Sequence, residues 1–162
     1  TKALVTGSLL AALAVVLKIS SFTLLDYRLT FYDIPLMISS IALGPLVGGM
    51  VGFITDWIYS IIMGYSIGLF SISSIIWGLV PGLLLYLFKH VNLKTIIVIV
   101  LVTSTLAFAA NTAALYLYYG SGTLANLPLR FVTMIIKWPI EVFALNIIYS
   151  RVLLPLKMKR EY

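Results

Sequence analysis

The sequence predicts an all-α integral membrane protein, a bundle of six transmembrane helices with both termini in the cytoplasm. Composition indicates the class, because 62% of the 162 residues are hydrophobic and only 10% are charged, whereas soluble domains hold about 25% charged residues. Length indicates the number of helices, since spans of about 20 residues joined by short loops allow five or six. We therefore expect a single membrane domain, residues 1–162.

The expected helices lie at about residues 3–22, 35–44, 46–63, 69–88, 95–118 and 127–154. The first follows Lys2 and is expected to be a membrane span, because no A-x-A cleavage motif of a secretory signal follows it. Ala3, Gly7 and Ala11 recur at every fourth position of this helix and form a face of small residues suited to close helix contact. That contact could be within the chain or with a helix of a partner, and the sequence leaves both open.

A polar and aromatic connector, residues 23–34, separates the first two helices and is expected to be a surface loop. Asp26, Arg28 and Asp33 fit such a loop, and Phe31 fits a membrane interface or a lid over a ligand. The connector is therefore a candidate lid.

Small residues also mark the third helix, where Gly48, Gly52, Asp56 and Ser60 recur at intervals of four. Asp56 should therefore face another helix and not lipid. We expect it to pair with a basic or hydroxyl group in preference to a ligand. In the fourth helix, Pro81 predicts a kink, because proline removes a backbone donor and clashes with the preceding turn.

The last helix carries Arg130, Lys137 and Glu141 inside an apolar run. At about 100° per residue, offsets of seven and eleven return these side chains to one face. A charge at membrane depth costs at least about 2.5 kcal/mol, so such side chains normally face a bundle interior or a watery cavity. Lys137 and Glu141 could also neutralise each other at i, i+4 spacing, and a purely structural network is the alternative. We interpret this stripe as one wall of a solute site.

The basic residues set the orientation of the bundle. Six spans would place most of the cations that flank the helices on one side of the membrane. These are Lys2, Lys89, Lys94, Lys157, Lys159 and Arg160. Cytoplasmic loops carry the excess of Lys and Arg, so this side is the cytoplasm and the first, third and fifth connectors lie outside. Arg130 then begins the last helix at its outer end, and Lys137 lies about 10 Å deeper. Phe70, Ser73 and Asn111 belong to the same outer half, so the site should open outward.

Several kinds of chemistry are not expected. The sequence has no cysteine and one histidine, His90, in a basic connector, so a metal site is improbable. It has no G-x-x-x-x-G-K-[ST] loop for ATP. The net charge of +6 is concentrated at helix ends, which indicates a membrane protein with no nucleic-acid partner. We expect no catalytic residues and no cofactor bound by this chain.

Two runs of sequence carry a family resemblance. The run LTFYDIPLMISSIALGPLVGGMVGFITDWI, residues 29–58, resembles the second and third helices of S-components, the substrate-binding subunits of energy-coupling factor vitamin transporters. The segments MGYSIGLFSISSIIWGLVPGLL and LPLRFVTMIIKWPIEVFALNIIY are most similar to the folate-specific branch, through the Leu127-Pro128-Leu129-Arg130 opening and the later Pro139-Ile140 followed by an acid.

The resemblance implies a tight vitamin pocket near the outer surface, closed by the first, third and fifth loops. It also implies two cytoplasmic ATPases that use ATP and a transmembrane coupling subunit that docks on Ala3, Gly7 and Ala11. The implied location is the cell membrane of a prokaryote, with multiple passes through lipid. Together these features predict a high-affinity vitamin-binding subunit that captures folate from outside.

A folate-like ligand, a flat heterocycle with an anionic tail, needs aromatic faces, hydrogen-bonding groups and a cation. The aromatic candidates are Phe31, Tyr65, Phe70 and Trp77. The candidates for reading the ring edge are Ser73, Asn111 and Glu141, with Lys137 beside them. Arg130, or Arg28 from the lid, could hold a carboxylate.

Other functions stay open at this point. The same class of subunit could bind riboflavin, a thiamine precursor or pantothenate. The polar stripe could belong to a structural membrane subunit that binds no small molecule, and a membrane enzyme is a third alternative.

Overall fold

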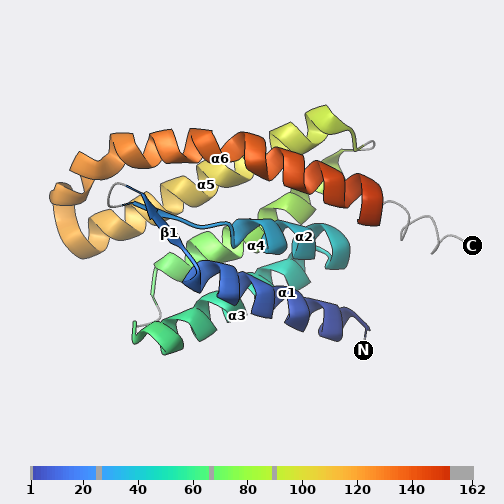
Figure 1. The fold of residues 1–162 in the computed structure, drawn as a ribbon, viewed down its shortest axis with the longest axis horizontal. Coiled ribbons are helices and arrows are strands. Elements are labelled where there is room, and N and C mark those ends of the chain that lie inside the picture. Colours follow the sequence, from blue (N-terminus) through green and yellow to red (C-terminus); the bar gives the residue numbers. More distant parts are fainter. Residues whose placement is uncertain (1, 25–26, 66–67, 89–90, 154–162) are drawn as a thin grey trace, which may run out of the picture.

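The computed structural model describes residues 2–24, 27–65, 68–88 and 91–153. They form a bundle of α-helices: α1 (Lys2–Ile19), α2 (Asp33–Leu43), α3 (Pro45–Met63), α4 (Phe70–Leu87), α5 (Leu93–Tyr119) and α6 (Leu127–Ile148). The start of α1 and the end of α6 lie at the same end of the bundle, and the short strand β1 (Phe22–Leu24) lies toward the other (Figure 1). The start of α1 and the end of α6 therefore share one end, and the first connector reaches the opposite half.

The helical, apolar character expected from composition is confirmed. Among the described residues, four helical stretches are long and apolar enough to cross a membrane, and one of them, Leu93–Leu153, joins α5 and α6. The expected count of six separate helices needs correction, because the predicted loop 120–126 is a 3-10 helix, η1 (Gly120–Asn126), and leaves five continuous helical stretches in the described chain. The helix α2 has 11 residues, too few to span a bilayer unaided.

The first connector differs from the expected irregular loop. The first helix, predicted to reach residue 22, ends at Ile19, and β1 pairs antiparallel with β2 (Tyr27–Leu29) in the register Phe22↔Leu29. The second helix begins at Asp33, two residues before the proline expected to begin it. The hairpin therefore leads directly into α2.

Helices α3 and α4 touch through their backbones. A Cβ atom on Gly48 would lie 2.0 Å from the carbonyl oxygen of Gly78, and one on Gly52 would lie 2.2 Å from that of Ser74. No side chain fits at these contacts, so the small residues allow an approach that any larger residue would prevent. The predicted small-residue face of the third helix packs here, against α4.

The helix α2 occupies the centre of the bundle, between α1 and α6 in the view of Figure 1. Leu36 and Met37 are fully buried. The Ser40 hydroxyl accepts a hydrogen bond of 2.8 Å from the Gly82 amide, next to Pro81 of α4. Helix α4 thus continues through its proline with a side chain of α2 bound to the neighbouring backbone.

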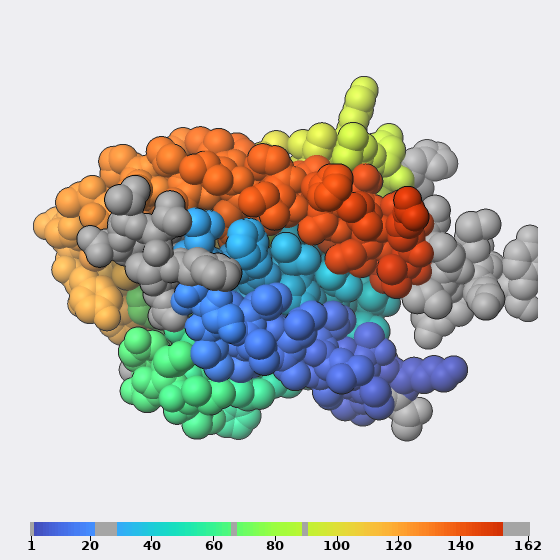
Figure 2. Space-filling model, viewed as in Figure 1, coloured from blue at the N-terminus to red at the C-terminus, as the bar shows by residue number. Residues whose placement is uncertain are grey.

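The small residues of α1 face the chain itself. Gly7 and Ala11 are buried, and a Cβ on Gly7 would lie 3.5 Å from a Val51 methyl group, whereas Ala3 is exposed. For Gly7 and Ala11 the structure therefore shows contact within the chain, one of the two alternatives that the sequence left open. In the space-filling view, α1 and α6 cross one face of the molecule with α2 visible between them (Figure 2).

Candidate ligand-binding site

A buried charged cluster joins α2 to α6. The Lys137 ammonium forms ion pairs with the Asp33 carboxylate and, at 3.1 Å, with Glu141 Oε1. Both carboxylates are 1% exposed, so the expectation that Asp33 belongs to a surface loop is wrong. The reason is tertiary, because Lys137 supplies the opposite charge that lets this acid enter the bundle. Asp33 also accepts a 3.0 Å hydrogen bond from the Ile34 amide at the start of α2.

One oxygen of Glu141 has no hydrogen-bond partner among the described residues. In the described part of the chain, Glu141 Oε2 is buried and accepts no hydrogen bond, while Oε1 faces Lys137. A buried polar atom left unsatisfied costs about 1–3 kcal/mol, and more when it is charged. Glu141 lines a cavity, so an N–H donor placed there would satisfy this oxygen.

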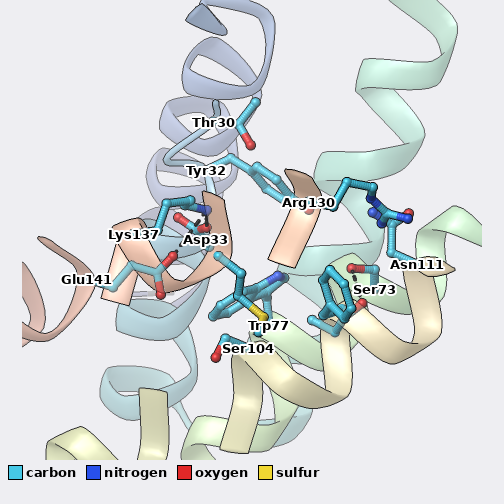
Figure 3. A pocket seen from close by; sticks show the side chains of 13 residues that line it. Thr30, Tyr32, Asp33, Ser73, Trp77, Ser104, Asn111, Arg130, Lys137 and Glu141 are labelled. Atoms are coloured by element: carbon cyan, nitrogen blue, oxygen red, sulfur yellow. Dashed lines mark hydrogen bonds and ion pairs between the residues drawn. The ribbon is translucent and has the colours of Figure 1, made fainter. Parts of the chain in front are cut away.

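Arg130 is a second buried charge on α6. It is 6% exposed, and its guanidinium carbon lies 5.3 Å from the ring centroid of Phe108. Within the described residues it forms no ion pair. Figure 3 shows its guanidinium beside Asn111, across the pocket from the Asp33–Lys137–Glu141 cluster, with Trp77 between the two. An uncompensated guanidinium at a cavity wall is suited to a carboxylate or another planar anion.

These side chains surround two adjoining cavities. The small cavity, about 100 Å³, is lined by Thr30, Tyr32, Asp33, Ser73, Trp77, Ser104, Ala107, Phe108, Asn111, Arg130, Met134, Lys137 and Glu141. The large cavity, about 830 Å³, has walls from every α-helix except α2 and is rich in tyrosine. The residues shared by both are Thr30, Tyr32, Ser73, Asn111 and Arg130. The two cavities therefore share part of their walls.

The structure brings most of the sequence-predicted candidates to these cavities. The small cavity is lined by Ser73, Trp77, Asn111, Arg130, Lys137 and Glu141, and the large cavity by Tyr65 and Phe70 together with three of these. Phe31 lines neither, although its ring centroid lies 5.8 Å from the Lys137 ammonium. The Arg28 side chain lies outside the described residues. Ligand contact by all of them stays a prediction.

Sequence reasoning missed Asp33 and Lys18 as cavity residues. Lys18, near the end of α1, forms an ion pair with Asp56 and lines the large cavity. Asp56 also accepts hydrogen bonds from Ser71 at 2.5 Å and Ser74 at 3.3 Å, so its expected pairing with a basic or hydroxyl group is confirmed, and both kinds of partner are present. The available signal for Lys18 was a cation at the end of the first apolar span, close to an aromatic connector.

The family can be assigned by comparison with known proteins. The model for the family described as ECF transporter, substrate-specific component, matches residues 2–150. The chain belongs to this family. ECF denotes the energy-coupling factor, so the resemblance noted in the sequence is confirmed, and this substrate-specific component is a subunit of a membrane transporter.

Solved structures share the fold. The crystal structure of FolT bound with folic acid superposes with a TM-score of 0.80 at 20% sequence identity, over 94% of this chain and 95% of that one. The S component of a bacterial ECF transporter superposes with a TM-score of 0.71 at 21% identity, over 96% and 98%. No curated protein matches by sequence. At these identities the structures establish a common fold.

Proposed function

We propose that this substrate-specific component binds folate in the two adjoining cavities, with the heterocycle in the small one. The observation that carries the proposal is the buried Glu141 Oε2, which has no hydrogen-bond partner in the described chain and belongs to a residue that lines that cavity. A pterin ring presents an amino group and a ring N–H side by side, and a carboxylate accepts such a pair of donors. The fold shared with FolT bound with folic acid supports the same ligand.

Aromatic and cationic side chains complete the proposed fit. Trp77 is 7% exposed and borders the small cavity, so its ring offers a face for stacking. Arg130 borders both cavities without an ion pair in the described residues, and it would bind a carboxylate of the tail beyond the ring. The large cavity, at about 830 Å³, falls within the range of about 300–1,000 Å³ usual for small-molecule sites.

The same proposal gives the subunit its place in a membrane. The end of the bundle that holds the start of α1 and the end of α6 would lie in the cytoplasm of a prokaryote, and the cavities would receive the vitamin from outside. A transmembrane coupling subunit and two cytoplasmic ATPases would drive uptake, with ATP used by those partners and not by this chain. The exposed Ala3 and its neighbours on α1 are the proposed contact with the coupling subunit.

Binding of radiolabelled folate to the detergent-purified chain tests this proposal. Arg130→Ala and Glu141→Gln should each weaken binding about 10- to 100-fold, because each loses charge-assisted hydrogen bonds. Trp77→Ala should also weaken binding, because it removes the ring proposed to stack on the heterocycle. Arg151→Ala, which removes an exposed cation near the end of the described chain, and Trp57→Ala, which removes an exposed ring, are the matched controls for Arg130→Ala and Trp77→Ala.

A screen of other vitamins decides between folate and its alternatives. Tighter binding of riboflavin, a thiamine precursor or pantothenate would replace folate as the ligand within the same family. If both Arg130→Ala and Trp77→Ala bound folate with wild-type affinity, the proposed site would be wrong. An absence of saturable binding by any vitamin would favour a structural subunit.

A further inference from the structure

Lys18 is a second cation on the wall of the large cavity, in addition to Arg130. It comes from α1, whereas Arg130 comes from α6, and both line the same space. The Lys18 ammonium lies 4.5 Å from the ring centroid of Tyr32 and 4.8 Å from that of Tyr59. Two aromatic rings and the Asp56 ion pair therefore hold this charge at a defined position.

The ammonium keeps hydrogen-bonding capacity for a ligand. A lysine ammonium has three N–H donors. Among the described residues, Lys18 uses two of them, one to Asp56 and one, at 3.2 Å, to the Ser74 hydroxyl. Asp56 in turn is bound by the hydroxyls of Ser71 and Ser74. The carboxylate is thus stabilised by other donors, and the third donor of Lys18 can serve a ligand group in the cavity.

The large cavity offers two cationic groups to an anionic tail. Its described lining holds two cations, Lys18 and Arg130, against one carboxylate, Asp56. A ligand that extends from Glu141 into this cavity passes the residues that both walls share, and Arg130 is the cation among them. We propose that the large cavity is a dicarboxylate subsite, in which Arg130 binds one carboxylate of the ligand tail and Lys18 binds the other.

This inference rests on the proposed function and adds a selectivity. The subunit discriminates a dicarboxylate conjugate of the heterocycle from a conjugate with one carboxylate, and Lys18 is the specificity-determining residue. The bound tail also connects the end of α1 to the start of α6, helices that otherwise meet through α2. Sequence reasoning gave Lys18 no role.

The test compares folate with pteroate, which has the same ring system but a single carboxylate. Lys18→Met alone would leave Asp56 buried without its cation, so the decisive variant is the double substitution Lys18→Met/Asp56→Asn, which removes both charges. This variant should weaken folate binding about 10-fold or more, because one charge-assisted contact is lost. Pteroate binding should change less than about 3-fold. Binding is measured by titration calorimetry, with thermal unfolding as a check of the fold.

Asp56→Asn alone should have the opposite effect on folate affinity. It keeps Lys18 and removes its competing carboxylate, so folate affinity should hold or rise while pteroate affinity stays level. Equal losses for folate and pteroate in the double variant, or a loss of folate affinity in Asp56→Asn as large as in the double variant, would overturn the dicarboxylate subsite alone. A wild-type chain that binds neither compound would instead overturn the proposed function.

Discussion

The contact between α3 and α4 and the contacts of α6 show two different ways of packing helices in this protein. Helices α3 and α4 meet backbone to backbone at Gly48 and Gly78, with no space for a side chain. Helix α6 packs through apolar side chains such as Leu145 and adds polar contacts, including the ion pair of Lys137 with Asp33 and the hydrogen bond of Trp138 with Ser104. Small residues therefore build a tight scaffold, the contact between α3 and α4, whereas α6 contacts its neighbours through longer side chains, of which Lys137 lines the small cavity.

The largest expected effect is on the scaffold. Gly48→Ala places a Cβ atom 2.0 Å from the Gly78 carbonyl oxygen, a backbone atom that cannot turn aside. We expect a loss of about 4 kcal/mol or more of folding stability, measured as a fall in thermal unfolding temperature in detergent. The control is the adjacent Gly49→Ala, whose Cβ would lie 3.4 Å from the flexible Leu79 side chain and should cost less than about 1 kcal/mol. Equal tolerance of both substitutions would show that α3 and α4 do not meet this closely.

The next effect concerns the charged cluster on α6. Lys137→Met leaves Asp33 and Glu141 buried without their cation, and breaking a buried pair in this way costs about 3–5 kcal/mol. Adding Asp33→Asn removes one of the stranded carboxylates and should restore part of the lost unfolding temperature.

Glu141→Gln separates function from stability in the same cluster. The ion pair of Lys137 with Asp33 stays, so we expect a loss of no more than about 1–2 kcal/mol in stability beside a large loss in folate affinity. A Lys137→Met protein as stable as the wild type would show that water reaches the cluster and that its charges need no partner.

The charged residues of α6 that line the cavity could be predicted from sequence better than the side chains that pair with them. Helical periodicity alone placed Arg130, Lys137 and Glu141 on one face, and all three line the small cavity. The acid that pairs with Lys137 could not be found this way, because Asp33 lies 104 positions earlier in a polar, aromatic connector. Its burial depends on a tertiary ion pair, which no local pattern records. Lys18 was not predicted to line the cavity for the same reason. A cation at a helix end is usually solvated, and the ion pair of Lys18 with Asp56 is also tertiary.

In the fold, too, some features could be predicted from the sequence and others could not. Spacing by four along the third helix predicted a small-residue face, and glycines of that face make the backbone contact with α4. The hairpin after α1 and the 3-10 helix Gly120–Asn126 were expected as loops, because Gly, Ser, Asp and Asn favour turns in sequence statistics. Which of several compact conformations such a segment adopts is decided by the helices that it joins.

The smallest effect should come from the link between α5 and α6. The indole N–H of Trp138 donates a 2.8 Å hydrogen bond to the hydroxyl of Ser104, and Ser104 lines the small cavity while Trp138 does not. Trp138→Phe keeps an aromatic ring and removes the donor, so stability should fall by about 1 kcal/mol and folate affinity should change less than about 3-fold. Trp57→Phe, an exposed ring on α3, is the control and should alter neither quantity. If Trp138→Phe lowered the unfolding temperature as much as Gly48→Ala, α6 would belong to the tight scaffold and the two ways of packing would not be separate.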